Sequence, residues 1–405
     1  MTFEQTFYVW NYLPGATRPV VAGRLQWEQP AGPGWFVYGR SYLERGDALP
    51  LDPCVLPLRQ QAFEFRSLNG YPGVVLDACP DFWGQRVIDR LCGPQAFPAG
   101  YLLLNDPGRV GSLAFSRSAT EMPQELQSRE FSLDELLAAA RAVEQDQDID
   151  PELLKALQPG TGGVRPKCTI EHDGALWIAK FASVKDPPGL DMARLEHATM
   201  RLARACGINA AETQVIDIHG GRVCLVRRFD RAFATGSVTR IGFISARSLF
   251  YADPAFNAQT GSYGRIARWL GQYGGDAGQK QELYRRMVFN CAVRNTDDHE
   301  LNHGLLQLPS GNCRLSPAYD VLPASKINRI NHHALQIGND HRGTVDNLLA
   351  APEAFALQKE EARDVIEKIE ATIQASWRDV CYEAGLDDEA LRRLERHFSP
   401  LPRTG

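Results

Sequence analysis

The amino-acid sequence predicts an α+β protein with a β-rich N-terminal domain and a mostly helical C-terminal region. Two patterns in its 405 residues indicate this fold class. As far as residue 118, short runs rich in β-branched and aromatic residues alternate with Gly and Pro at a spacing typical of hairpins. Beyond residue 240, apolar residues recur with the period of an α-helix. The length suits roughly two or three domains.

Changes in residue pattern divide the chain into four segments. These are 1–118, a β-rich domain; 119–150, a helical linker; 151–232, a small sheet with one helix; and 233–405, a helical region with polar loops. The polar stretch 143–151 ends in a proline, which interrupts the linker helix. We therefore expect the clearest domain boundary near residue 150.

Local signals predict the individual elements. Apolar residues on one face predict a short helix at 82–92, and Ser132 with Glu135 forms a capping-box pattern that starts the linker helix. An Asp-Gly pair at 173–174 between two β-like runs predicts a hairpin, and a helix is expected at 189–206. Further strands are expected at 214–218 and 222–227, and further helices at 242–250, 261–273, 280–294, 352–357 and 359–378.

Composition excludes several classes of protein. The 44 basic and 49 acidic residues give a net charge of −5, which argues against a surface devoted to nucleic-acid binding. No apolar run reaches the about 18–20 residues of a membrane-spanning helix, and the N-terminus lacks the basic start of a secretory signal. The nine cysteines form no C-x-x-C pair. A cytoplasmic protein with reduced thiols is expected.

One group of residues suggests phosphate binding. Gly160, Gly162 and Gly163 form a Gly-rich turn, and glycines allow backbone N–H groups to approach an anion. Lys180 on the second hairpin strand would neutralise phosphate charge, and Glu196 on the next helix would hold the lysine. The P-loop pattern is absent. Taken singly, these features also fit a hairpin turn, an edge-strand lysine and a solvated glutamate.

A second group lies in two polar loops. Asp297 and Asn302 stand five residues apart, which is the spacing of the Asp and Asn in the protein-kinase catalytic loop, and Asp320 begins a later loop. In that arrangement the first Asp accepts a hydroxyl proton, and the Asn and second Asp hold magnesium. The alternative is a polar loop whose Asp and Asn side chains cap turns.

A competing motif overlaps the first of these loops. His299, Glu300 and His303 form a literal H-E-x-x-H, the pattern of zinc metallopeptidases. That chemistry needs both histidines on one stable helix. Gly304 follows the second histidine directly, so a helix here would be very short. The zinc metallopeptidase is the remote alternative.

Several segments together resemble the HipA family, the serine/threonine kinase toxins of type II toxin–antitoxin modules. The resemblance lies in VAGRL, DFWGQRVIDRL and VGSLAFS near the N-terminus, and in GTGGVRPK, LWIAKF, NTDDHELNHGLL and LSPAYDVLP later in the chain. It implies an N-terminal domain followed by a two-lobed protein-kinase-like fold, with ATP and Mg²⁺ as cofactors. It also implies a protein substrate such as an aminoacyl-tRNA synthetase and a HipB-type helix-turn-helix antitoxin, through which alone DNA would be contacted. No membrane partner is implied.

The resemblance also assigns roles to single residues. Asp297 becomes the catalytic base, Asn302 and Asp320 the magnesium ligands, and Lys180 the phosphate-contacting lysine. The residues that would contact ATP are Gly162, Gly163, Val164, Arg165, Lys167, Lys180, Glu196, Arg227, Arg228, Phe229, His299, Asn302, Tyr319 and Asp320.

The sequence departs from the family pattern at three places. The Gly-rich loop lacks the serine that family members autophosphorylate, so Thr161 is the only hydroxyl left for that reaction. Asp298 stands where Gly is common and is expected to add a second negative charge to the site. Leu301 stands where a lysine often precedes the Asn. Leu301 and the missing serine favour an alternative, a nucleotide-binding pseudokinase that acts as a subunit of a toxin–antitoxin or operator-binding complex.

Overall fold

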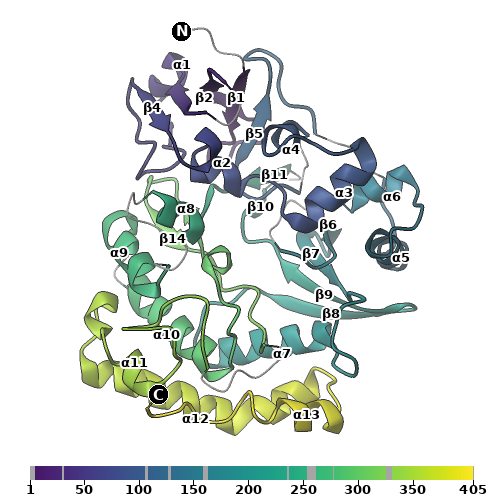
Figure 1. Ribbon diagram of the computed structural model, residues 1–405, viewed down its shortest axis with the longest axis vertical. Coiled ribbons are helices and arrows are strands. Elements are labelled where there is room, and N and C mark those ends of the chain that lie inside the picture. Colours follow the sequence, from purple (N-terminus) through teal and green to yellow (C-terminus); the bar gives the residue numbers. More distant parts are fainter. Residues whose placement is uncertain are drawn as a thin grey trace.

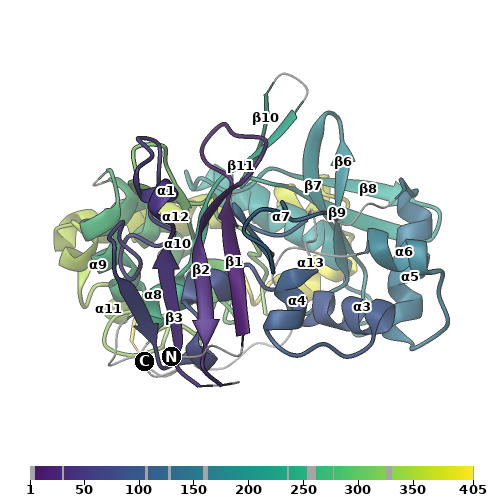
Figure 2. The same cartoon turned by 90° about the horizontal axis from the view of Figure 1, so that it is seen from above.

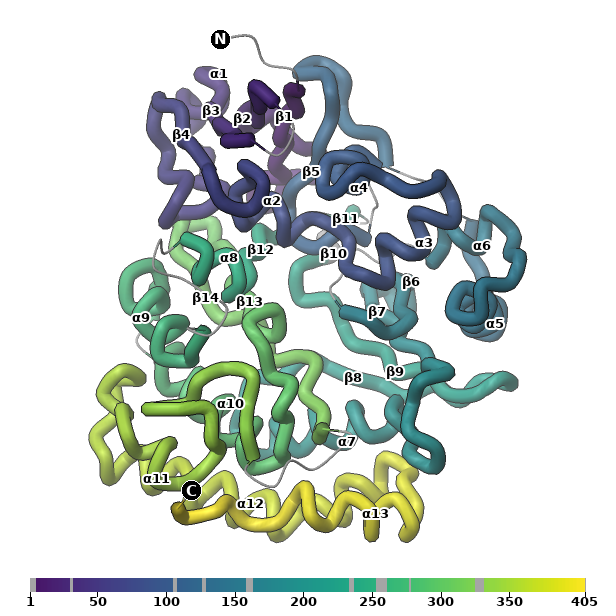
Figure 3. The backbone as a smooth tube through the Cα atoms, in the orientation of Figure 1, coloured from purple at the N-terminus to yellow at the C-terminus, as the bar shows by residue number. Residues whose placement is uncertain are grey.

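The computed structural model describes residues 5–29, 32–104, 108–125, 129–157, 163–234, 237–252, 261–276, 278–324 and 331–404. Two larger sheets and a helical region make up the molecule. In Figure 1 the N-terminal sheet lies at the top, the second sheet at the right, and the C-terminal helices at the bottom. The tube in Figure 3 follows the chain through these parts in the same order. The arrangement has the predicted α+β class.

The N-terminal sheet has five antiparallel strands in the order β4-β3-β2-β1-β5. Its strands are β1 Gln5–Asn11, β2 Val20–Trp27, β3 Gly34–Tyr38, β4 Ala62–Phe65 and β5 Leu113–Ser116. Figure 2 shows β1, β2 and β3 side by side. Four short helical segments connect or cover the strands: α1 Arg40–Leu43, η1 Leu68–Gly70, α2 Gly73–Asp77 and α4 Ala99–Leu103. Alternate strand residues, among them Phe7, Leu25 and Phe36, are buried beneath them.

The second sheet has four antiparallel strands in the order β6-β7-β9-β8. Its strands are β6 Lys167–His172, β7 Ala175–Phe181, β8 Thr213–Ile218 and β9 Gly221–Arg227. The predicted hairpin joins β6 and β7, where Asp173 and Gly174 both have positive φ angles, 49° and 68°. This is the conformation that an Asp-Gly pair favours in a two-residue hairpin loop.

Helices from three parts of the chain cover one face of this second sheet. They are α3 Phe82–Cys92, α5 Leu133–Glu144 and α6 Pro151–Ala156. Trp83 and Val87 of α3 belong to the same buried cluster as Trp177 and Phe181 of β7, so α3 packs on the second sheet rather than on the first. The predicted capping box is confirmed, because Ser132 and Glu135 exchange both hydrogen bonds at the start of α5. The segment boundaries at 118, 150 and 232 stay predictions.

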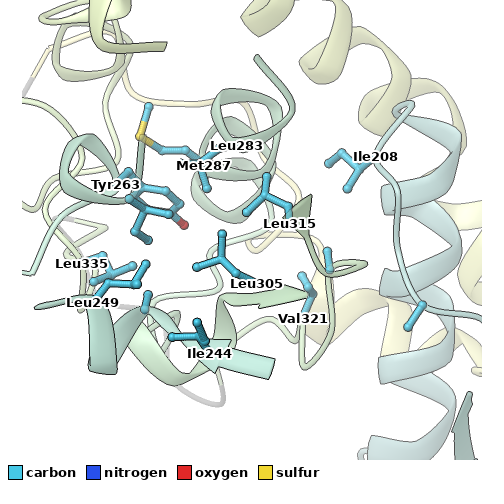
Figure 4. Packing of buried hydrophobic residues seen from close by; sticks show 14 of the residues in the cluster. Ile208, Ile244, Leu249, Tyr263, Leu283, Met287, Leu305, Leu315, Val321 and Leu335 are labelled. Carbon is cyan, nitrogen blue, oxygen red and sulfur yellow. The ribbon is translucent and has the colours of Figure 1, made fainter. Parts of the chain in front are cut away.

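The remaining helices form the C-terminal region. They are α7 Met192–Ala205, α8 Ala246–Tyr251, α9 Tyr263–Tyr273, α10 Gly278–Ala292, η3 Glu300–Asn302, α11 Val345–Leu348, η4 Pro352–Phe355, α12 Lys359–Glu383 and α13 Asp388–Leu394. Figure 4 shows Leu283 and Met287 of α10 packed close to Tyr263, Leu305 and Leu315 in the core of this region. Helix α12 packs against both α7 and α10 (Figure 1). Among the described helices, none combines the length and apolar character needed to cross a membrane.

Some element predictions were wrong in detail. The helix expected at 242–250 begins only at Ala246, because residues Phe243–Ser245 form strand β12 and pair with β13 Gly304–Gln307. The helix expected at 352–357 is a four-residue 3₁₀ helix, and α12 continues five residues beyond the expected end at 378. The short strands β10 Arg231–Ala234, β11 Ser237–Arg240 and β14 Cys313–Leu315 were not predicted.

Candidate active site

Lys180 is the centre of the candidate site. Burial alternates along β7, so that Ala175, Trp177 and Ala179 face the covering helices and Lys180 faces the opposite side. There its Nζ lies 2.5 Å from Glu196 Oε1 and 2.7 Å from Asp320 Oδ1. Burial opposes the charge, but the two carboxylates raise the pKa of Lys180 well above its ordinary value. The lysine is therefore a fixed cation between two anions.

Glu196 reaches the lysine from helix α7. Its side chain is only 3% exposed. The helix begins after Asp191, whose carboxylate accepts the N–H of Arg194, and Leu195, Ala198 and Leu202 are buried on its inner side. The acid therefore sits on the part of α7 that packs against the second sheet.

Helix α7 is also attached to the end of the chain. Arg201 forms an ion pair with Glu383 at 2.6 Å, and an Arg194 guanidinium N–H donates to the carbonyl of Gly385 at 2.6 Å. Arg393 donates to the carbonyl of Pro188, in the loop before α7, at 2.7 Å. These contacts hold the helix that carries Glu196 against α12 and α13.

Asp320 completes the central triad from a loop 140 residues away from Lys180. Its φ angle of 58° is the left-handed conformation, which costs energy for a residue other than Gly and is often found at functional sites. Lys180 holds the pKa of Asp320 well below its ordinary value, with a further contribution from Lys167. The side chain is nevertheless 41% exposed. An ionised and accessible carboxylate of this kind is a suitable ligand for a hard cation.

Asp297 lies in the loop that follows α10 and is exposed. Partial burial raises the pKa of its carboxyl above the ordinary value, His299 opposes the shift, and Asp320 and Asp298 add to it. Asp297 and Asp320 therefore lie close enough to repel one another. A carboxylate with a raised pKa at an accessible position is a competent general base.

Asn302 ends the single turn of η3 and is buried. Its N–H donates to the carbonyl of His299 at 2.9 Å, and the hydroxyl of Tyr319 donates to the carbonyl of Leu301 at 2.7 Å. Because Tyr319 directly precedes Asp320, this bond ties the loop of Asn302 to the loop of Asp320. The two predicted magnesium ligands thus come from loops that are hydrogen-bonded together.

Asp298, the predicted second negative charge, adds to the raised pKa of Asp297, but its carboxylate is buried rather than exposed to the site. Its side chain is 4% exposed and accepts hydrogen bonds from the hydroxyl of Tyr263 and, at 2.9 Å, from Nε2 of His303. Burial would raise the pKa of Asp298, but His303 and Tyr263 keep it below its ordinary value. The carboxylate is therefore held by hydrogen bonds inside the protein rather than directed at the site.

The same contacts remove the basis of the zinc hypothesis. Nε2 of His303 is committed to Asp298, and His299 Nδ1 accepts the N–H of Leu301 at 3.3 Å. The segment between the two histidines is one 3₁₀ turn rather than a helix. Within the described ranges, no group of three or more His, Cys, Asp or Glu side chains is arranged to hold a metal ion.

The predicted Gly-rich loop is described from Gly163 onward, so Gly162 and Thr161 lie outside the described residues. Gly163 has a φ angle of 126°, and a Cβ atom there would lie 2.3 Å from Nζ of Lys167. A side chain at this position would displace the ammonium group, and the positive φ angle itself favours glycine. Val164 is 70% exposed, and Arg165 forms an ion pair with Asp186.

The loop lysine has a partner that sequence reasoning missed. Lys167 is buried and its Nζ lies 3.3 Å from Oδ2 of Asp81, the residue before helix α3. The two positions are 86 residues apart, and the sequence contains no motif that connects them. The only signal is that Asp is a preferred residue before a helix, and this predicts a cap rather than an ion pair.

Arg227, Arg228 and Phe229, three neighbouring residues expected to contact ATP, lie in different surroundings. The N–H groups of Arg227 and Arg228 already donate to the carbonyls of Glu212 and Leu176, each at 2.9 Å. The Arg227 side chain is exposed and pairs with Glu212, whereas that of Arg228 is buried and pairs with Asp230. Phe229 packs against Tyr319 with 5.4 Å between the ring centroids. Only Phe229 therefore has its side chain against the loop of Asp320.

Comparison with known proteins gives one family match and two partial relatives. A family model described as HipA-like C-terminal domain matches residues 160–377. "Putative kinase Y4dM" from Sinorhizobium fredii is 30% identical over 164 residues, which are 38% of this chain and 38% of that protein. A "Putative kinase" from Haemophilus influenzae is 26% identical over 153 residues, which are 36% of this chain and 45% of that protein. The matches span less than half the length of these curated relatives.

One solved structure resembles almost the whole chain. It comes from the Shewanella oneidensis MR-1 toxin–antitoxin complex of HipA, HipB and operator DNA, and it superposes with a TM-score of 0.71. The superposition covers 97% of this chain and 95% of that chain, with 17% sequence identity. At that identity the likeness establishes the fold. It confirms the predicted fold class, including the β-rich N-terminal region.

Proposed function

The chain belongs to the HipA-like C-terminal domain family, and on that premise we propose that it is a HipA-type protein kinase. In this proposal it transfers the γ-phosphate of ATP to a serine or threonine of another protein. The observation that carries it is the Glu196–Lys180–Asp320 triad, in which a strand lysine is held by a helix acid and a loop acid. Protein kinases use a lysine and an acid in these roles to position phosphates and metal.

The residues present suit magnesium. Asp320 offers an ionised, accessible carboxylate and Asn302 an amide oxygen, and oxygen donors are the ligands that magnesium prefers. When bound, magnesium would neutralise charge on the nucleotide phosphates. The chain itself supplies two further cations: Lys180, and Lys167, which stands opposite Lys180 in the paired strands β6 and β7. Both lysines would contact phosphate oxygens.

Asp297 is the proposed catalytic base. It is exposed, so that a substrate hydroxyl can reach it, and the nearby charge of Asp320 helps to raise the pKa of its carboxyl. Its role would be to orient the attacking hydroxyl and accept the proton. Leu301 supplies no cation here, so phosphate neutralisation falls to Lys167, Lys180 and the metal. Autophosphorylation at Thr161 stays a prediction.

The partners are proposed by analogy with the similar solved complex. That complex contains HipB and operator DNA. We infer that this chain pairs with a HipB-type helix-turn-helix antitoxin, contacts DNA only through that complex, and acts in the cytoplasm. An aminoacyl-tRNA synthetase is the proposed class of substrate.

A phosphotransfer assay tests the proposal. The full chain is incubated with a bacterial lysate, magnesium and γ-labelled ATP, beside an Asp320→Ala variant. Labelling of a protein by the unchanged chain, and its loss in the variant, supports a kinase. ATP binding without transfer to any protein would contradict this and favour the second candidate, a nucleotide-binding pseudokinase, which the absent loop serine and Leu301 also favour.

A further inference from the structure

Asp81 lies outside the region matched by the family model but reaches the candidate nucleotide site. It caps helix α3, where its Oδ1 accepts the N–H of Gly84 at 2.7 Å. Its other oxygen, Oδ2, lies 3.3 Å from Nζ of Lys167. The two side chains are only 8% and 5% exposed, so the pair is buried. One carboxylate therefore both starts a helix and holds the loop lysine.

The surroundings of Lys167 fix it in place from several sides. Trp83, two residues after Asp81, donates its indole N–H to the carbonyl of Lys167 at 2.9 Å. Gly163 lies so close to the ammonium group that a side chain there would displace it. Lys167 is also the direct cross-strand partner of Lys180, and such partners project from the same face of a sheet.

Two carboxylates compete for the charge of Lys167. One is Asp81, which contacts it, and the other is Asp320, whose pKa Lys167 helps to lower. Lys180 contacts Glu196 and Asp320, Lys167 contacts Asp81, and the charge of Lys167 also acts on Asp320. Without Asp81, the buried ammonium would lose the carboxylate that contacts it, and the attraction of Asp320 would count for more, because a buried charge needs a counter-ion. Asp320 would then be less available to a cation, and Lys167 less available to phosphate.

We propose that Asp81 is a positioning residue of the nucleotide site, through which the N-terminal part of the chain orients Lys167 toward the phosphates of ATP. The inference rests on the proposed function, since it assumes that ATP binds here. It goes beyond that function by assigning part of the site to a segment that precedes the matched region 160–377. Asp81 acts through Lys167 and is not itself in contact with the nucleotide.

A double-mutant cycle tests this relationship in the full chain. Binding of magnesium–ATP is measured by calorimetry for the unchanged protein, Asp81→Asn, Lys167→Met and the double variant. Asparagine also caps helices well, so Asp81→Asn removes the charge and keeps the cap. We expect Asp81→Asn to weaken ATP binding roughly tenfold, as the loss of one charged hydrogen bond does. In the Lys167→Met background it should have no further effect.

Steady-state kinetics and matched control variants separate a positioning role of Asp81 from a purely structural role. In phosphotransfer, Asp81→Asn should raise the KM for ATP while kcat changes little, because the lost interaction serves binding. Asp387→Asn is the matched control, since Asp387 caps helix α13 by accepting the N–H of Ala390 at 2.9 Å. It should leave ATP affinity unchanged. Asp81→Ser, which also retains a capping group, repeats the comparison in an independent variant.

The outcomes distinguish the possible failures. If the unchanged protein binds no ATP, the proposed function fails and this inference fails with it. If it binds ATP and Asp81→Asn binds equally well, only the inference is overturned. Equal weakening by Asp81→Asn with and without Lys167 would also overturn it, because Asp81 would then act through the fold alone.

Discussion

Nζ of Lys180 lies 2.7 Å from Oδ1 of Asp320, although the two residues are 140 positions apart. A strand of the second sheet and a loop of the C-terminal region therefore meet at one ion pair. Glu196 joins it from α7, which α12 and α13 hold from outside. The fold itself thus brings together the charged groups that we propose for phosphate chemistry, and positioning of this kind is the main contribution of a protein to phosphoryl transfer.

Removing Lys180 should affect both stability and activity. Lys180→Met leaves Glu196 buried without its counter-ion, which costs about 3–5 kcal/mol of unfolding free energy. A second change, Glu196→Gln, removes the unpaired charge and should restore much of that stability. Phosphotransfer should stay absent in both variants. Chemical denaturation together with the labelling assay checks this, and a double variant as unstable as Lys180→Met would contradict the assigned ion pair.

Asp52 should make stability depend on pH. It is fully buried, and burial raises the pKa of its carboxyl to about 6, against the hydrogen bonds from the N–H groups of Cys54 and Val55. The folded state binds the carboxyl proton more tightly than the unfolded state does. This tighter binding contributes to the free energy of unfolding at low pH, and the contribution is lost as pH rises through about 6.

The variant that tests this prediction is Asp52→Asn, which removes the ionisable group and keeps nearly the same side-chain volume. It should stabilise the protein by roughly 1–3 kcal/mol near neutral pH, and by less as pH falls toward the ordinary carboxyl pKa of about 3.9. Thermal unfolding across this pH range measures the difference. A gain that grows toward acid pH would have the wrong sign for this account.

Asp298 should behave as a structural residue. Because it is paired with His303 inside the protein, Asp298→Asn should lower stability by about 1–3 kcal/mol. The KM for ATP should change less than about twofold, well below the tenfold that 1.4 kcal/mol represents. Denaturation and steady-state kinetics on one preparation test both parts. A large change in the KM with unaltered stability would show that this carboxylate faces the nucleotide.

Two glycines allow the effect of backbone strain alone to be compared with the effect of strain together with a contact on Lys167. Gly163 and Gly174 both have positive φ angles, but a Cβ atom at Gly163 would meet Lys167 Nζ, whereas at Gly174 it would meet nothing within 4 Å. Each Gly→Ala change should cost about 1 kcal/mol of stability. Only Gly163→Ala should also weaken ATP binding, which titration of both variants would measure. Similar binding by the two variants would contradict the placement of Lys167 beneath the loop.

The sequence predicted the parts of the site that carry a local pattern. Lys180 follows an alternating strand, Glu196 lies on an amphipathic helix, and the spacing of Asp297 and Asn302 is itself the motif. Each pattern lies within a short stretch of chain. The structure shows the predicted contact between Glu196 and Lys180, and Asp320 also contacts the lysine. Their exact catalytic roles stay predictions.

What the sequence did not predict depends on long-range packing. Asp81 meets Lys167 only because α3 folds onto the second sheet, across 86 residues of chain. The sequence identifies Asp298 as an acidic residue next to Asp297, but only the structure shows that Tyr263 and His303 donate hydrogen bonds to its buried carboxylate. Strands β12 and β14 have three residues each, which is too short for any periodic pattern to identify them.

The most direct test of the central claim compares ATP binding and phosphate transfer in Asp297→Asn. Because Asp297 is exposed, the variant should fold normally and bind magnesium–ATP as the unchanged protein does. Transfer of the γ-phosphate to protein should fall roughly 10²- to 10⁴-fold, which is the usual contribution of a general base. Transfer at an undiminished rate would contradict the assignment of this loop as the catalytic centre.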